Sequence, residues 1–178
     1  IKEIFPKANI YQFDAVNHEK KAYKNTFFYE VCLGSVNEKK YFYTKGLSGD
    51  SLFREKDNKL SKVNYTEKDK KLMNTYSLDY FTNIKNIPKP DYLKIDAQGA
   101  ELIILKGGQD ILNNTKFVQL EVSYVDYNLG GCMVEDILNH MRINRFLPVG
   151  FNHIKGDTFN IIQGDILFHK FSEFDYFK

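Results

Sequence analysis

Three acidic residues end or interrupt short apolar runs that lie far apart in the chain. Asp14 and Asp96 each directly follow such a run, and Glu121 lies within another, at residues 117–123. In an open α/β sheet, ligands bind at the carboxyl ends of the strands. Carboxylates gathered there can accept hydrogen bonds from hydroxyl groups and can act as general bases. The pattern predicts a ligand site without naming its reaction.

The elements that would position these residues alternate between strands and helices, which favours an α/β fold. Strands are expected at residues 8–13, 26–33, 40–44, 91–96, 117–123, 146–151 and 159–168. Helices are expected at 17–24, at 99–113 with a break at Gly107 and Gly108, and from Val134 to Met141, where apolar residues recur at i, i+3, i+4 and i+7. Residues 153–157 are expected to join the last two strands. The expected sheet is mostly parallel, with an antiparallel carboxyl-terminal edge.

Composition limits the class of protein. The 178 residues are 43% hydrophobic, which is enough for one core, so a single domain is expected over residues 1–178. Lys and Arg total 25 against 23 Asp and Glu, without the basic excess of a nucleic-acid binder. No apolar run approaches the length of about 20 residues that spans a bilayer, and no signal peptide is visible. A cytoplasmic protein is therefore expected.

Cysteine and histidine usage does not indicate a metal site. Cys32 and Cys132 form no C-x-x-C pair, so a zinc site is not expected, and two reduced thiols are favoured over a disulfide. The histidines are scattered and do not pair with a cysteine or carboxylate at ligand spacing. They are His18, His140, His153 and His169.

Residues 54–71 contain eleven charged residues among eighteen. Such a composition is typical of a solvated loop that cannot bury much apolar surface. The alternative is a lid over a substrate site, since loops often carry function.

The most specific motif begins at Lys94-Ile95-Asp96, continues with Gly99 and Glu101, and is followed by Leu105-Lys106-Gly107. It resembles the signature of FkbM-type methyltransferases, approximately K-I-D-x-x-G-x-E and then L-K-G. Further resemblances occur in the family's order, and together they cover nearly the whole chain, with an insertion at the charged loop. They are residues 10–14 for its second strand, 31–35 for its third strand and turn, 119–123 for its fifth, and 163–168 for its closing strand.

The resemblance implies a Rossmann-like, class I methyltransferase sheet that binds S-adenosylmethionine. It implies that Asp14 accepts hydrogen bonds from the ribose hydroxyls, although a helix N-cap is the alternative. Cys32 and Leu33 would lie at the adenine edge, or else belong to the core. The implied reaction is O-methylation of a hydroxyl, with a sugar or glycan precursor as acceptor.

The same resemblance places Asp96 beside the transferable methyl group, as both a cofactor contact and a catalytic residue. There it would orient the acceptor hydroxyl or take its proton, while helix capping is the alternative. Glu121 would contact the acceptor, or would be a buried structural carboxylate. Four further residues are expected near the acceptor: Glu101, Ser48, Ser51 and His153. The alternative for Glu101 is a structural carboxylate at a helix end, and the alternative for Ser48 and Ser51 is a simple turn.

The chain departs from the family pattern in two places. No glycine-rich turn of the form D-x-G-A-N-x-G precedes Ile4, and residues 1–7 resemble the end of the helix that should follow it. The first strand and this turn are therefore expected to be missing from the sequence. Asp14-Ala15 also stands where the family has Glu-Pro, which shortens the acid's reach by one methylene.

These departures keep a second hypothesis open, a non-catalytic Rossmann-like module that binds a partner. Exposed strand edges in an incomplete sheet would invite pairing with another chain, and a homo-oligomer is compatible with this. A nicotinamide dehydrogenase is disfavoured, because the sequence contains no G-x-G-x-x-G.

Overall fold

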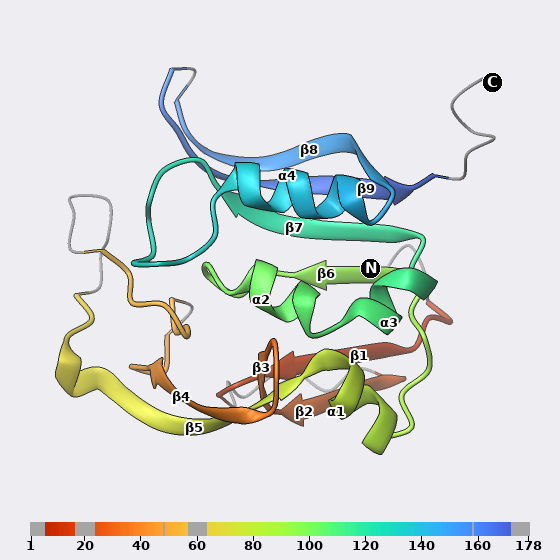
Figure 1. Cartoon of the computed structure of the whole chain (residues 1–178), viewed down its shortest axis with the longest axis horizontal. Coiled ribbons are helices and arrows are strands. Elements are labelled where there is room, and N and C mark those ends of the chain that lie inside the picture. Colours follow the sequence, from red (N-terminus) through yellow and green to blue (C-terminus); the bar gives the residue numbers. More distant parts are fainter. Residues whose placement is uncertain (1–5, 17–23, 48, 57–63, 158, 172–178) are drawn as a thin grey trace.

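The computed structural model describes residues 6–16, 24–47, 49–56, 64–157 and 159–171, and it has a mixed α/β architecture (Figure 1). Its strands form three hydrogen-bonded groups. The helix expected at 17–24 falls almost entirely outside the described residues. Within those residues, no helix is both long and apolar enough to span a membrane.

The largest group is a four-stranded sheet in the order β6-β7-β9-β8. β6 (Tyr92–Ile95) pairs in parallel with β7 (Phe117–Ser123), and β7 pairs antiparallel with β9 (Ile161–Lys170). β8 (Phe146–Gly156) adds antiparallel to β9 and forms the edge. The predicted antiparallel carboxyl-terminal edge is therefore confirmed.

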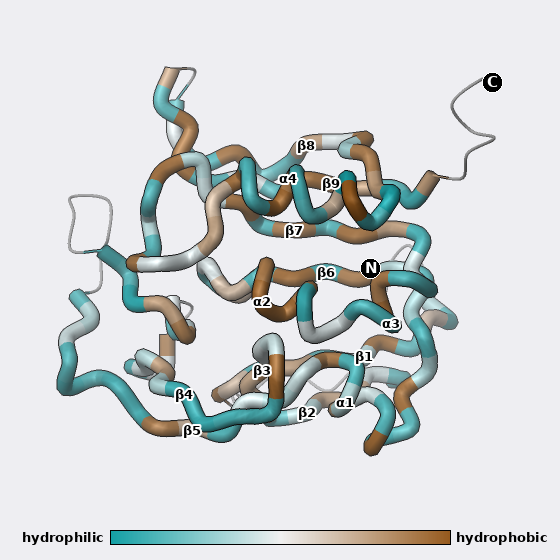
Figure 2. Tube along the Cα trace, in the orientation of Figure 1, coloured by the Kyte–Doolittle hydropathy of each residue, from teal (hydrophilic) through white to brown (hydrophobic). Residues whose placement is uncertain are grey.

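Three helices cover one face of this sheet (Figure 1): α2 (Glu101–Lys106), α3 (Gln109–Asn114) and α4 (Val134–Ile143). Alternate residues of β7 point toward them, so that Val118 and Leu120 are fully buried. Full burial of such a side chain contributes about 1.5–3 kcal/mol. Figure 2 shows hydrophobic residues along β6, β7 and the facing turns of α2. This core holds β6 and β7 in register, and with them Asp96 and Glu121.

The amino-terminal strands form two smaller groups. β1 (Ile10–Asp14) pairs in parallel with β2 (Thr26–Glu30). β3 (Cys32–Gly34) pairs in parallel with β5 (Lys70–Ser77), and β4 (Glu38–Tyr43) pairs antiparallel with β5. No pairing joins these groups to β6 among the described residues, so the single continuous sheet expected from the sequence is not observed there.

Two predictions for this region are wrong. Residues 26–33 form two strands instead of one. β2 pairs with β1 up to the hydrogen bond from Val31 N to Asp14 O at 2.7 Å, and β3, which follows, pairs with β5. β5 was not predicted, because its first residues, Lys70 and Lys71, belong to the segment that was interpreted as a charged loop. The strand predicted at 40–44 corresponds to β4, which lies beside β5.

The described part of the charged segment is more ordered than a solvated loop. Glu67–Asp69 form a short 3-10 helix that Thr66 caps, and β5 begins directly after it. Residues 57–63 lie outside the described residues, so the lid alternative stays untested. Helix α1 (Leu78–Ile84), which follows β5, was not expected from the sequence.

The carboxyl-terminal hairpin is longer than predicted. Residues 153–156 continue β8 instead of turning, and the connection to β9 follows Gly156. There the Asp157 carboxylate accepts hydrogen bonds from Phe159 N and Asn160 N, both at 2.9 Å. Asp157 and Asn160, rather than Gly156 alone, therefore shape the described part of this connection.

The predicted helix break is confirmed, and it brings α2 against β3. A Cβ atom built on Gly107 would lie 2.3 Å from Gly34 O and 3.0 Å from Ser35 O. We expect Gly107→Ala to destabilise the protein by about 1–3 kcal/mol, because backbone atoms must move apart. Urea unfolding measures this change. Gly150→Ala is the control, since its Cβ would meet only Leu167 Cβ at 3.8 Å, and equal destabilisation by both variants would contradict the close contact.

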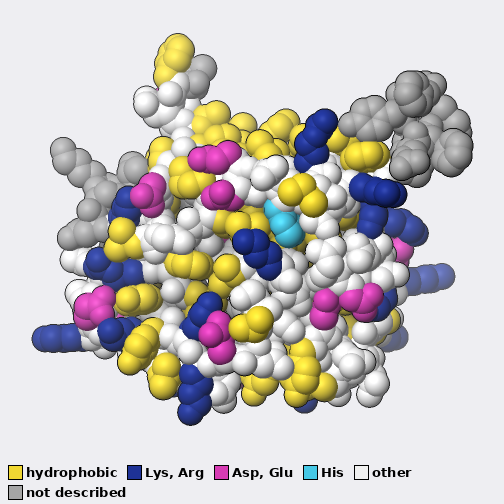
Figure 3. Space-filling view, viewed as in Figure 1, with side chains coloured by type: hydrophobic (Ala, Val, Ile, Leu, Met, Phe, Trp, Pro, Cys, Tyr) yellow, Lys and Arg dark blue, Asp and Glu magenta, His cyan; other side chains and the backbone are white. Residues whose placement is uncertain are grey.

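The surface carries charges of both signs. Figure 3 shows Lys and Arg side chains interspersed with Asp and Glu side chains on the face that carries α2–α4. Exposed ion pairs such as Lys89–Asp110 and Lys116–Asp91 belong to this pattern. Pairs of this kind contribute little to stability, about 0–1 kcal/mol each.

Candidate functional site

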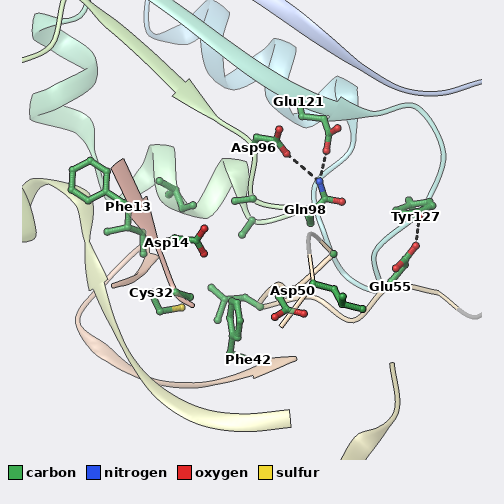
Figure 4. A pocket seen from close by; sticks show the side chains of 18 of the residues that line it. Phe13, Asp14, Cys32, Phe42, Asp50, Glu55, Asp96, Gln98, Glu121 and Tyr127 are labelled. Carbon is green, nitrogen blue, oxygen red and sulfur yellow. Dashed lines mark hydrogen bonds between the residues drawn. The ribbon is translucent and has the colours of Figure 1, made fainter. Parts of the chain in front are cut away.

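A pocket of about 790 Å³ lies at the carboxyl ends of β1, β3 and β6 (Figure 4). Small-molecule sites have volumes of about 300–1,000 Å³. β1 and β3 form one side of the pocket, and the turn after β6 together with β7 forms the other. Asp14, Asp96 and Glu121 all line it. The structure thus brings together the three acidic residues that the sequence pattern singled out.

Asp14 is the last residue of β1, and its carboxylate lies on the side of the pocket opposite Asp96 (Figure 4). Asp14 Oδ1 accepts a hydrogen bond from Val16 N at 3.2 Å, which fixes the direction of the side chain. The N-cap alternative concerns residues 17–23, which lie outside the described residues.

The wall beside Asp14 is apolar and comes mainly from Val31, Cys32, Leu33 and Phe42. Cys32 is buried, and this burial raises the pKa of its thiol to about 12, against the opposing charge of Lys40. The thiol is therefore neutral near pH 7 and behaves as a small apolar group. Both Cys32 and Cys132 are free, which confirms the prediction of two reduced thiols.

Gln98 joins the two carboxylates at the other side of the pocket. Its Nε2 donates to Asp96 Oδ1 at 3.1 Å and to Glu121 Oε2 at 2.6 Å (Figure 4). The backbone of Gln98 has φ 50°, and Gly99 follows with φ 94°. A non-glycine residue in this left-handed region costs about 1–3 kcal/mol and is often found where a side chain must be held for function. Gln98 was not predicted as a site residue, although its position before Gly99 indicates such a turn.

Glu121 is buried within β7, and burial raises the pKa of its carboxyl group. Lys155 opposes this effect, because its Nζ lies 2.8 Å from Glu121 Oε1. The neighbouring Asp96 raises the pKa further, since two nearby negative charges repel. Gln163 Nε2 donates a longer bond of 3.4 Å to Glu121 Oε2. Glu121 is thus a buried carboxylate with a full set of partners.

Three residues expected near the acceptor do not line the pocket. Ser51 Oγ lies 3.0 Å from Ala97 O and 2.8 Å from Gln98 O, and so ties the loop after β4 to the turn after β6. The Glu101 carboxylate caps the backbone of that same turn, and His153 Nδ1 lies 3.0 Å from Asp165 Oδ2. The contacts of Ser51 and Glu101 match their structural alternatives. Ser48 lies outside the described residues.

Glu55, Tyr127 and Asp50 line the pocket without having been predicted (Figure 4). Tyr127 donates its hydroxyl to Glu55 Oε1, and burial raises the pKa of that hydroxyl. Asp50 accepts hydrogen bonds from Thr44, Lys45 and Gly46 and holds the loop after β4. These residues come from irregular segments, where sequence periodicity gives no signal. Within the described ranges, no three His, Cys, Asp or Glu side chains gather as metal ligands.

The fold and this pocket define an α/β protein with a ligand site at strand ends, and comparison identifies its class as a methyltransferase. Residues 3–148 match the family model of the methyltransferase FkbM domain. Because the match spans most of the chain, the protein belongs to the FkbM methyltransferase family, as the resemblance in the sequence implied. No curated protein and no solved structure matches the chain.

Proposed function

We propose that the protein is an S-adenosylmethionine-dependent O-methyltransferase that acts on a hydroxyl of a sugar or glycan precursor. The observation that carries this proposal is the division of one pocket into two ends. Asp14 and an apolar wall form one end, and Asp96 and Glu121 form the other. Family membership supports methyl transfer, and the two ends fit a nucleoside cofactor and a hydroxyl acceptor, respectively.

At the cofactor end, the residues fit an adenosine group. The Asp14 carboxylate offers two acceptor oxygens for the vicinal hydroxyls of a ribose. Leu33 and the neutral thiol of Cys32 offer apolar surface for a flat base. We propose that these three residues hold the nucleoside of S-adenosylmethionine within a Rossmann-like sheet.

At the acceptor end, Asp96 would accept a hydrogen bond from the hydroxyl that is methylated. When bound, S-adenosylmethionine supplies an electrophilic methyl group on a sulfonium centre. The Asp96 carboxylate would take the proton that the acceptor hydroxyl loses on methylation. Gln98 fixes Asp96 relative to Glu121, so that the acceptor is positioned before reaction.

Binding of the cofactor tests this proposal. We expect Asp14→Ala to weaken binding of S-adenosylmethionine about 10- to 100-fold, because a hydrogen bond to a charged group contributes about 1.5–3 kcal/mol. Calorimetric titration of the full chain measures the dissociation constant. Asp91→Ala is the matched control, since the Asp91 side chain is 87% exposed on the surface.

Unchanged binding by Asp14→Ala would contradict the role of Asp14. If the folded wild-type protein binds neither S-adenosylmethionine nor S-adenosylhomocysteine, the non-catalytic Rossmann-like module becomes the better interpretation.

A further inference from the structure

The charges that line the pocket are mostly negative. Five carboxylates face it, and among the described lining residues Lys155 is the single cation. The carboxylates belong to Asp14, Asp50, Glu55, Asp96 and Glu121. A phosphate or carboxylate group on a ligand would enter a negative field in a partly desolvated site. Placing two like charges against each other in a binding site costs several kcal/mol of binding free energy.

Lys155 is not available to offset this field. Its Nζ lies 2.8 Å from Glu121 Oε1 and 3.3 Å from Gln163 Oε1. An anionic ligand that recruited Lys155 would leave the Glu121 carboxylate, which is only 7% exposed, without its counter-charge. The Lys155 side chain is 57% exposed, so the loss is smaller than for a fully buried pair, but the buried Glu121 carboxylate would still lose its charged partner.

Glu55 offers a hydrogen-bond acceptor to a ligand. The residue is 7% exposed, and its backbone forms an isolated antiparallel bridge with Asn128. Tyr127 donates to Oε1, whereas no described residue donates to Oε2. A Cβ atom built on Gly49 would lie 3.4 Å from Oε2, so the glycine leaves space beside this oxygen. Because Glu55 lines the pocket, a hydroxyl of a ligand there could donate a hydrogen bond to Oε2.

We propose that the acceptor is a sugar or polyol without phosphate or carboxylate groups, and that Glu55 accepts a hydrogen bond from one of its hydroxyls. Glu55 is then a specificity residue, separate from the carboxylate pair at Asp96 and Glu121 (Figure 4). The inference rests on the proposed methyl transfer, and it adds the chemical class of the acceptor. Carboxylates that only accept hydrogen bonds suit a ligand rich in hydroxyl donors.

Transfer of a tritium-labelled methyl group from S-adenosylmethionine tests the acceptor class on the wild-type protein. Three sets of acceptors are compared at equal concentrations: methyl glycosides of neutral hexoses, hexose phosphates and uronic acids. We expect kcat/KM for the best neutral glycoside to exceed that for either anionic set at least about 100-fold. Equal or faster transfer to an anionic sugar would overturn the inference.

The variant Glu55→Gln tests the residue. We expect it to raise the KM for the best neutral glycoside about 3- to 10-fold, because the ligand hydroxyl then donates to a neutral amide oxygen instead of a carboxylate. We expect kcat and the dissociation constant of S-adenosylmethionine to stay unchanged. Glu135→Gln, an exposed change of the same type on α4, is the control, and thermal unfolding checks that both variants fold.

An unchanged KM in folded Glu55→Gln would overturn the role of Glu55. If the wild type binds S-adenosylmethionine but methylates no neutral glycoside, the acceptor inference fails while the cofactor site stands. If it does not bind S-adenosylmethionine, the proposed function fails as well.

Discussion

Replacing Asp96 with asparagine is expected to lower kcat about 100- to 10,000-fold, the usual contribution of a positioned general base. Asparagine has nearly the same shape and can still accept a hydrogen bond, but it cannot take the proton of the acceptor hydroxyl. Asp96 directly follows β6, and Gln98 Nε2 holds its Oδ1 at 3.1 Å. The dissociation constant of S-adenosylmethionine should change little, because Asp14 and the apolar wall hold the nucleoside. Single-turnover methyl transfer separates these two quantities.

Asp91→Asn serves as the control for this experiment. It makes the same chemical change at an exposed residue, which is paired with Lys116. A kcat for Asp96→Asn within about threefold of the wild-type value would show that Asp96 does not take the proton. Glu121 would then be the next candidate, since burial raises the pKa of its carboxyl group.

Glu101→Ala is expected to cause the largest loss of stability, about 2–5 kcal/mol. The Glu101 carboxylate accepts hydrogen bonds from Ala97 N at 2.8 Å and from Gly99 N at 3.0 Å, and the residue is 3% exposed. Alanine would leave both backbone donors buried without an acceptor, and each such group costs about 1–3 kcal/mol. The same turn carries Gln98, so activity should fall together with stability. Urea unfolding measures the loss.

The pH dependence of that loss gives a second check. Burial raises the pKa of Glu101 to about 7 from 4.5, against the hydrogen bonds from Glu101 N and Ala97 N. A raised pKa means that the folded state binds the proton more tightly. The contribution of Glu101 to the free energy of unfolding is fully present below pH 4.5 and is lost as the pH rises through 7. Destabilisation by Glu101→Ala should therefore be larger at pH 5 than at pH 8, and the reverse order would contradict this assignment.

Much of the carboxyl-terminal half could be predicted from the sequence. The alternation of Val118, Leu120 and Val122 predicts β7 correctly, since only one face of that strand meets the helices. The apolar spacing from Val134 to Met141 likewise predicts α4. Such patterns reflect burial on one side of a helix or strand, and they can be recognised without knowing which elements pack against it.

The region around β5 could not be predicted in the same way. Lys70, Lys71 and Leu72 lie on a strand in which only Thr75 is buried, so its sequence contains no burial period to detect. Its pairing with β3 and β4 depends on backbone hydrogen bonds, to which any residue type contributes.

The site shows the same division. Positions at strand ends marked Asp14 and Asp96, and a position near a strand end marked Glu121, because parallel strands share one carboxyl edge. Glu55 and Tyr127 reach the pocket from loops whose course depends on the whole fold, and no spacing links two residues so far apart in sequence. Glu101 looked like a site residue because of its motif, yet its carboxylate binds the backbone of the turn instead.

A crystal structure of the full chain with S-adenosylhomocysteine would test the central claim most directly. The proposed function predicts that the ribose hydroxyls lie within hydrogen-bond distance of the Asp14 carboxylate, with the adenine beside Cys32 and Leu33 and the sulfur atom turned toward Asp96. A ligand bound elsewhere, or bound in this pocket without contact to Asp14, would contradict it.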